Sequence, residues 1–566
     1  MPPFRQLVNN MLPNVDFPEL LLEVAEMTAL PDAFTHISGA LTTMEDFAVS
    51  LCAVWLSEAC NVGLTPVVKP DVPALTRVRL VQVDQGYFRA ENISAGNGLF
   101  IEAQAKIDVA RAWGGGLVAS ADGVRFTVPV KSLYSGHSPK YFGLRHKGAT
   151  WLNVINDQVM GLGGVVVPGT LRDSLFILDA IHARDGGPKP EAVITGTASY
   201  SDIVFGLFAI CGYQFSPRIA DITDARLWRI NAAADYGPLE PVSGHTIRLD
   251  RVRTHWGDML RVAGSLTLGE VRGYDLIRML SHDGKPTALG DAFAHYGRIF
   301  KTLHLLQYVS DEGYRRLIGA QLNVTEARHR IARKIFFGQR GELHQHYREG
   351  MEDQLGALGL ALNAVVLFNT LYMDAAVKQL AADGFPVTDD LIARLSPLQY
   401  NHINFFGRYA FTRPPAPGTR PLRDPNAPEE TDHGGLTVPR PTPSPCATAN
   451  FRSDTPQRPY GAAPCGGVGV TVIRRSRTST QSSPRPGVWA RWAHGWRRLW
   501  TCSSRAAPVR RPSPKGSSWT MSFQWRRWRL AVPRRRADAP VPGLFSPWSM
   551  ACWPASAAST SARTRS

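Results

Sequence analysis

The sequence is poor in cysteine and contains no Cys-x-x-Cys pair, since its 566 residues include only 7 cysteines. This scarcity argues against a disulfide framework and against a zinc site, and it indicates a reducing compartment. The first residues also lack the basic start and the apolar run of a secretory signal. We therefore predict a cytoplasmic protein, and its length predicts about two to four domains.

Acidic residues are nearly absent from the C-terminal part of the chain. Positions 434–566 hold 22 Lys and Arg but only two acids, whereas positions 1–433 hold 41 basic and 45 acidic residues. The formal net charge of +16 therefore originates beyond residue 433. Because the remainder is nearly neutral, the overall basicity does not by itself indicate a body that binds nucleic acid.

The stretch 414–566 also lacks the regular apolar spacing of helices and strands. Nine of the 14 Trp lie beyond residue 480, among many Pro, Arg, Ser and Ala. This composition predicts a disordered tail. It is also typical of GC-rich DNA translated in an unintended frame, so we favour a frameshift or read-through product. The alternative is a functional basic arm, in which Arg neutralises phosphates and Trp stacks on bases.

One apolar run is long enough to cross a bilayer, because residues 355–373 contain no charge over 19 residues. Two Asn and two Gly interrupt this run, and charged residues lie close to both of its ends. We therefore predict a buried core helix here and no membrane partner.

The region before residue 414 has the spacing of a mixed α/β protein. Residues 1–110 are predicted to be mostly helical, and residues 115–130 to form two short strands around an Asp-Gly turn. Residues 221–320 have a charged, helical pattern and are interpreted as an insertion, and 322–338 predict a strong helix with Thr325 near its start. Further strands are predicted at 151–157, 164–168 and 191–195, and further helices at 171–184 and 201–211.

Several sequence blocks together resemble the DDE transposases of the class II replicative transposons (the Tn-three family). The resemblance covers residues 15–412. It implies an RNase H-like α/β core in two parts, 111–220 and 321–413, separated by the helical insertion at 221–320. The blocks are SADGVRF at 120–126, PKYFG at 139–143, SYSDIVFGLF at 199–208, GYQFSPRIADI at 212–222, EARH at 326–329, KIFFG at 334–338, LSPL at 395–398 and HINFFG at 402–407.

The resemblance also implies the chemistry. Two Mg²⁺ ions would be held by carboxylates at Asp122, at position 196 and at Glu326, and they would serve cleavage and joining of DNA at transposon ends. Position 196 is Gly, in a Thr-Gly-Thr sequence where the family has Thr-Asp-Thr. Gly offers no side-chain ligand, so a truncated and catalytically impaired transposase is expected, with DNA and further transposase subunits as its partners.

Each singled-out residue also has a structural alternative. Asp122 precedes Gly123 and is compatible with a hairpin turn, and Glu326 is compatible with a first-turn carboxylate favoured by the helix dipole. Asp202 is either a substitute ligand for position 196 or, as we favour, the cap of the following helix. His329 either touches substrate or metal or, as we favour, packs as a neutral ring or contacts a phosphate.

Two alternatives to a transposase remain at this point. A non-enzymatic fragment would associate with intact transposase subunits and lower their activity. A decayed reading frame would have no function, and both the C-terminal stretch and Gly196 fit that alternative.

Overall fold

A computed structural model describes residues 3–40, 42–197, 200–223, 225–282, 285–413, 416 and 418–425. The described residues belong to one compact unit bounded by Met1 and Asp432. The predicted disorder of the stretch 414–566 therefore concerns positions that are mostly outside the described residues. The predicted boundaries at 110, 220 and 320 stay predictions.

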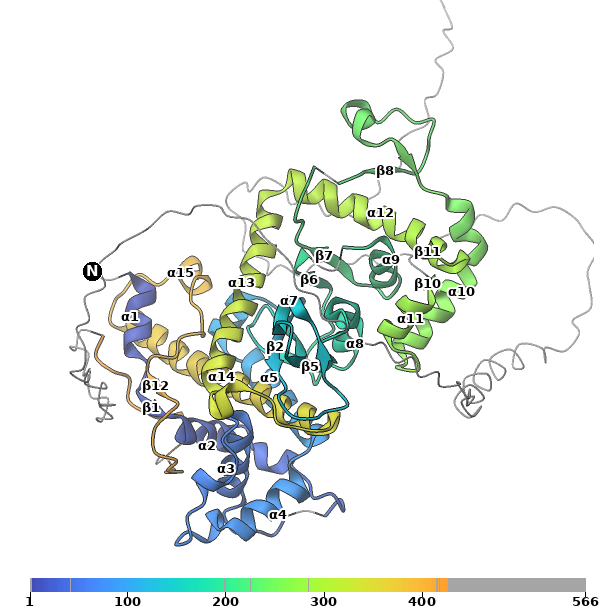
Figure 1. The fold of residues 1–566 in the computed structure, drawn as a ribbon. Coiled ribbons are helices and arrows are strands. Elements are labelled where there is room, and N and C mark those ends of the chain that lie inside the picture. Colours follow the sequence, from blue (N-terminus) through green and yellow to red (C-terminus); the bar gives the residue numbers. More distant parts are fainter. Residues whose placement is uncertain are drawn as a thin grey trace, which may run out of the picture. The chain divides into compact units, whose positions relative to one another are not determined.

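A mixed six-stranded sheet lies at the centre of the fold (Figure 1). The long strand β2 pairs antiparallel with β4 on one side and parallel with β6 on the other, and β6 pairs parallel with β7. The strands β3 and β5 each pair antiparallel with β4. This arrangement confirms the predicted mixed α/β class. The strands are β2 (Val118–Thr127), β3 (Gly136–His137), β4 (Lys147–Asn156), β5 (Gly161–Pro168), β6 (Ala192–Thr195) and β7 (Gln214–Pro217).

The predicted Asp-Gly turn at Asp122 is wrong, because β2 is one continuous strand. Asp122 pairs with Asn153, and Gly123 pairs with Leu152, in an unbroken ladder with β4. Neither residue has the positive φ that a tight hairpin turn requires. The flanking strands β4 and β6 therefore hold this dipeptide extended, whatever its local turn preference.

The sheet and a long helix, α14 (Arg348–Ala382), are surrounded by helices. Trp55 on α3 donates a hydrogen bond to the Ala357 carbonyl of α14 at 3.0 Å, and Phe4 stacks on Phe385 with ring centroids 5.3 Å apart. The helices before the sheet are α1 (Phe4–Met11), α2 (Phe17–Met27), α3 (Phe47–Ala59), α4 (Arg77–Tyr87), α5 (Ala90–Ala105) and α6 (Asp108–Trp113). The others are α7 (Pro139–Phe142), α8 (Ile177–His182), α9 (Asp202–Ile210), α10 (Leu249–Thr267), α11 (Gly273–Met279), α12 (Ala288–Ser310), α13 (Glu312–Ile335) and α15 (Asp389–Ala393).

The apolar run at 355–373 forms the middle of α14. Among the described residues this is one helix long and apolar enough to cross a membrane, but 83% of its most apolar window is buried inside the protein. The prediction of a buried core helix is therefore confirmed.

The start of the predicted helical insertion is not helical. Residues 221–223 and 225–247 form loops, a 3-10 turn at Gly237–Val242 and two short paired strands, β8 (Trp228–Arg229) and β9 (His245–Thr246). Pro and Gly recur in this segment and interrupt helical hydrogen bonding. The helices of the insertion begin only at Leu249, and a short antiparallel pair of strands, β10 (Ser281–His282) and β11 (Lys285–Pro286), lies between α11 and α12.

The helices α9 and α12 cross so closely that only Gly fits at the crossing. A Cβ atom at Gly297 would overlap the carbonyl oxygen of Asp202. We expect Gly297→Ala to lower the free energy of unfolding by about 1–3 kcal/mol, because the two backbones must separate. Gly264→Ala on α10, where a Cβ meets nothing within 4 Å, is the matched control. If denaturant unfolding shows equal effects for both variants, the close crossing does not limit stability.

Candidate active site

Asp122 lies in the middle of β2, on the face of the sheet that α13 covers. Its side chain is 45% exposed. Partial burial raises the pKa of Asp122, the nearby charges of Asp173 and Glu326 act in the same direction, and the Gly123 N–H and Arg125 oppose the shift. The strand thus presents a carboxylate in a setting that disfavours an isolated negative charge and favours pairing with a cation.

Glu326 is exposed and lies in the second half of α13, not in its first turn. The helix begins at Glu312 and is capped by Asp311, whose side chain accepts from the Tyr314 N–H. The predicted start near residue 322 is therefore wrong, and so is the alternative that the helix dipole explains Glu326. Apolar spacing continues from Tyr314 through Ile318, which extends the helix at its N-terminal end.

A buried set of hydroxyl and amide groups fixes α13 on β2. The Ser120 and Thr325 hydroxyls lie 2.6 Å apart, and the Gln321 amide donates to the Ser120 hydroxyl at 3.1 Å. Ser120 is two residues before Asp122, and Thr325 directly precedes Glu326. The structure therefore brings the two predicted carboxylates to one side of the sheet, near enough for their charges to interact.

Gly196 lies at the end of β6, beside Asp122. The parallel register of β2 and β6 ends with Ala121 opposite Thr195, so Asp122 and Gly196 are the next residues along the two segments. A Cβ atom built on Gly196 meets nothing within 4 Å. The space for a third carboxylate exists, but the side chain is missing.

His329 lies one helical turn after Glu326 and faces Asp122. Its Nδ1 is 3.9 Å from Asp122 Oδ2, and its Nε2 is 3.3 Å from the side-chain amide of Asn153. Burial, reinforced by three neighbouring arginines, lowers the pKa of His329 to about 3. The ring is thus neutral at pH 7, which is the form taken both by a packed ring and by a metal-binding imidazole.

Asp202 neither caps α9 nor replaces the missing carboxylate. Ser201 is the cap, and its hydroxyl accepts from the Val204 N–H at 3.3 Å. The two Asp202 oxygens instead bind Arg298 and Lys301 of α12, each at 2.9 Å. The predicted cap is off by one residue, and both carboxylate oxygens of Asp202 are occupied by cations.

The sequence patterns did not single out Arg328, which supports the turn of α13 that carries Glu326. Its side chain is 2% exposed, and its guanidinium donates to the Val159 carbonyl and to Asn363 Oδ1, both at 2.9 Å. In the sequence, Arg328 is only a charged residue between Glu326 and the apolar end of the helix. Such a pattern is common in surface helices, so it does not reveal a buried arginine.

The residues at the site do not fit a complete centre for two Mg²⁺ ions. Asp122 and Glu326 supply two carboxylates, and Gly196 supplies none. Within the part of the chain that the structure describes, no group of three or more His, Cys, Asp or Glu side chains is arranged to hold a metal ion. An octahedral site with two carboxylates would need most of its ligands from water or DNA.

Comparison with known proteins identifies the family. Residues 19–409 match the family described as the Tn3 transposase DDE domain. The chain is 55% identical over 427 residues to the transposase for transposon Tn4556 of Streptomyces fradiae, covering 75% of this chain and 48% of that protein. It is 49% identical over 407 residues to the transposase for transposon gamma-delta of Escherichia coli, covering 72% of this chain and 40% of that protein.

The matched region contains Asp122, Gly196 and Glu326, as well as the whole central sheet. A DDE domain implies an RNase H-like core, and the strand order β5-β4-β2-β6-β7 is the sheet that carries the site here. The chain spans less than half the length of these relatives. On the family match and these identities, the chain belongs to the Tn3 transposase family.

Proposed function

We propose that this chain carries the catalytic core of a Tn3-family transposase with an incomplete metal site, and that it is impaired in cutting and joining DNA at transposon ends. One observation carries this proposal: Gly196 lies beside Asp122 in the β2–β6 register, with open space where a carboxylate would stand. DNA and other transposase subunits are its proposed partners, in a bacterial cytoplasm.

The missing side chain matters because of charge and geometry. DDE transposases typically depend on Mg²⁺, a hard cation that requires oxygen ligands in a near-octahedral arrangement. Two carboxylates bring two negative charges to a site meant for two dications. A third carboxylate adds charge and can bridge both ions, so its absence weakens metal binding before any chemistry begins.

We expect Gly196→Asp to restore metal binding. The Cβ of the added side chain displaces no atom, since a Cβ at Gly196 has no neighbour within 4 Å. The loss of even an outer-shell partner typically costs about 10–100-fold in metal affinity, so a gain of at least that order is expected from a new direct ligand. Isothermal titration of the full chain with Mn²⁺ or Mg²⁺ measures it.

Two further variants test whether the gain comes from this site. Adding Asp122→Ala or Glu326→Ala to Gly196→Asp should abolish the gain, because the three ligands act as one unit. Thr197→Asp, one residue further along, is the matched control with the same added charge and should bind no tighter than the parent. If Gly196→Asp and Thr197→Asp behave alike, Asp122, Gly196 and Glu326 do not form a metal site.

A further inference from the structure

We propose that the connection between β2 and β4 forms a surface that binds the sugar–phosphate backbone of double-stranded DNA beside the active site. This surface, called here the basic hairpin, comprises residues 128–148 together with His346 and Tyr347. The inference rests on the proposed function, because it assigns a place to the DNA on which a transposase core acts.

The first observation is a one-sided charge. Between Asp122 and Asp157 the sequence contains five Lys and Arg and no acid. The body as a whole is nearly neutral, with 41 basic and 45 acidic residues over positions 1–433. An excess of this kind concentrated in one connection gives a local positive potential, which attracts phosphates.

The second observation is that, within the described part of the chain, four of these five cations form no ion pair, although Lys140 lies over the Tyr141 ring at 5.1 Å. Of the five, Arg125 pairs with Asp173 at 2.8 Å. The other four form no ion pair with any residue that the structure describes. Arg298 and Lys301, by contrast, both pair with Asp202, which neutralises their charges. The four unpaired cations are Lys131, Lys140, Arg145 and Lys147.

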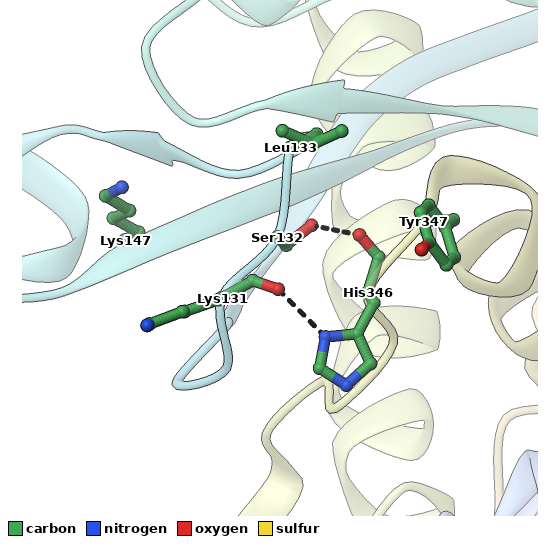
Figure 2. A pocket seen from close by; sticks show the side chains of 6 residues that line it. All are labelled: Lys131, Ser132, Leu133, Lys147, His346 and Tyr347. Atoms are coloured by element: carbon green, nitrogen blue, oxygen red, sulfur yellow. Dashed lines mark hydrogen bonds between the residues drawn. The ribbon is translucent and has the colours of Figure 1, made fainter.

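The third observation is a pocket with exposed apolar groups among these cations (Figure 2). The pocket has a volume of about 500 Å³ and is lined by six residues. Leu133 is 93% exposed and Tyr347 is 67% exposed, although both are large and apolar. Exposed apolar groups next to cations suit a ligand that has anionic phosphates beside the apolar faces of its sugars. The lining residues are Lys131, Ser132, Leu133, Lys147, His346 and Tyr347.

The pocket is held open by two hydrogen bonds that Figure 2 shows as dashed lines. The Ser132 hydroxyl donates to the His346 carbonyl, and His346 Nδ1 donates to the Lys131 carbonyl, both at 2.8 Å. These bonds tie the hairpin to the segment that leads into α14. A preformed surface loses little conformational entropy when it binds a ligand.

The fourth observation is the position of the surface relative to Asp122. Thr127 ends β2 and pairs with Gly148, next to Lys147. Five residues of strand separate Asp122 from Thr127, which is about 17 Å at ~3.3 Å per residue. One full turn of B-form DNA spans about 34 Å, so this distance is close to half a turn. A duplex that places one phosphate at Asp122 therefore brings backbone phosphates about half a turn away to the basic hairpin.

Lysine footprinting on the full chain tests this proposal directly. The chain is acetylated with and without a duplex of random sequence, and modification is quantified by mass spectrometry. We expect duplex DNA to lower acetylation of Lys131 and Lys147 several-fold, while exposed Lys106 and Lys285 change little. This readout is local, so binding of DNA by the basic C-terminal stretch does not mask it.

Salt dependence of duplex binding gives a second, matched measurement. The slope of log K against log salt is negative, and each phosphate contact contributes about −0.9 to it. Lys131→Gln combined with Lys147→Gln should therefore make the slope shallower by about 1.8. Lys106→Gln combined with Lys285→Gln removes the same charge elsewhere and should leave the slope nearly unchanged. Equal slopes for the two double variants would overturn the proposal.

The outcomes separate this inference from the proposed function. Protection of other lysines but not of Lys131 and Lys147 overturns the basic hairpin as the DNA site and leaves the transposase core intact. The absence of protection at every lysine, together with no measurable duplex binding in the salt series, would contradict DNA binding by the chain and thus the proposed function as well. Equal protection by heparin at the same charge concentration would show a general polyanion surface and overturn the assignment to DNA.

Discussion

Asn363→Leu is expected to lower the free energy of unfolding by about 3–5 kcal/mol, because it leaves a buried arginine without its side-chain partner. Asn363 Oδ1 accepts from the guanidinium of Arg328 at 2.9 Å and from the Gly161 N–H at 2.8 Å. Burial lowers the pKa of Arg328 to about 9, so the group is still charged at pH 7. Denaturant unfolding followed by tryptophan fluorescence measures the loss.

A double variant separates the buried charge from simple loss of packing. Arg328→Met combined with Asn363→Leu removes both the charge and its acceptor, so it should be more stable than Asn363→Leu alone. A double variant that is less stable than Asn363→Leu would show that the charge is not what the amide stabilises. Since Arg328 is two residues from Glu326, metal titration of the Gly196→Asp chain would also report any displacement of that carboxylate.

Arg420→Met is expected to have a similar effect, about 3 kcal/mol or more, because it leaves a buried carboxylate uncompensated. Glu23 on α2 is fully buried and binds Arg420 Nε at 2.5 Å. The same carboxylate accepts from the Tyr372 hydroxyl at 2.5 Å and from the Gly418 N–H at 3.0 Å. The midpoint of thermal unfolding should fall by several degrees.

Arg413→Met is the matched control for this prediction. Arg413 also pairs with two acids, Glu26 and Asp46, but its side chain is 48% exposed. Exposed pairs contribute about 0–1 kcal/mol, so this variant should be nearly as stable as the parent. Equal destabilisation by both variants would contradict the view that burial of Glu23 determines the effect.

The contacts of Arg420 also show where prediction from the sequence is limited. Regular apolar spacing ends near Arg413, which predicts a body that ends there. Residues 418–425 nevertheless contact the body, and Arg423 donates through its backbone N–H to the Met11 carbonyl at 2.9 Å. Such contacts depend on single polar side chains that meet distant partners, and no periodic pattern records them.

Elements defined by local apolar spacing were the most predictable. The strand β6 and the core helix α14 follow directly from such runs. The turn predicted at Asp122 fails for the opposite reason, because two neighbouring strands override a local preference. Asp122 and Glu326 are identified through the family resemblance, whereas Asn153 and Arg328 become apparent only when strand register and helix packing bring them to the site.

The packing of the first helices on α14 has a consequence for how the chain is made. Trp55 and its acceptor Ala357 are 302 residues apart. A bacterial ribosome adds roughly 5–20 residues per second, so the interval between the two is on the order of 15–60 s. The interval between the synthesis of Phe4 and that of its stacking partner Phe385 is longer still. Throughout that interval the faces of α1, α2 and α3 that pack on α14 lack it, although α3 already contacts α2 and α4. Newly synthesised chains should therefore bind chaperones until α14 leaves the ribosome.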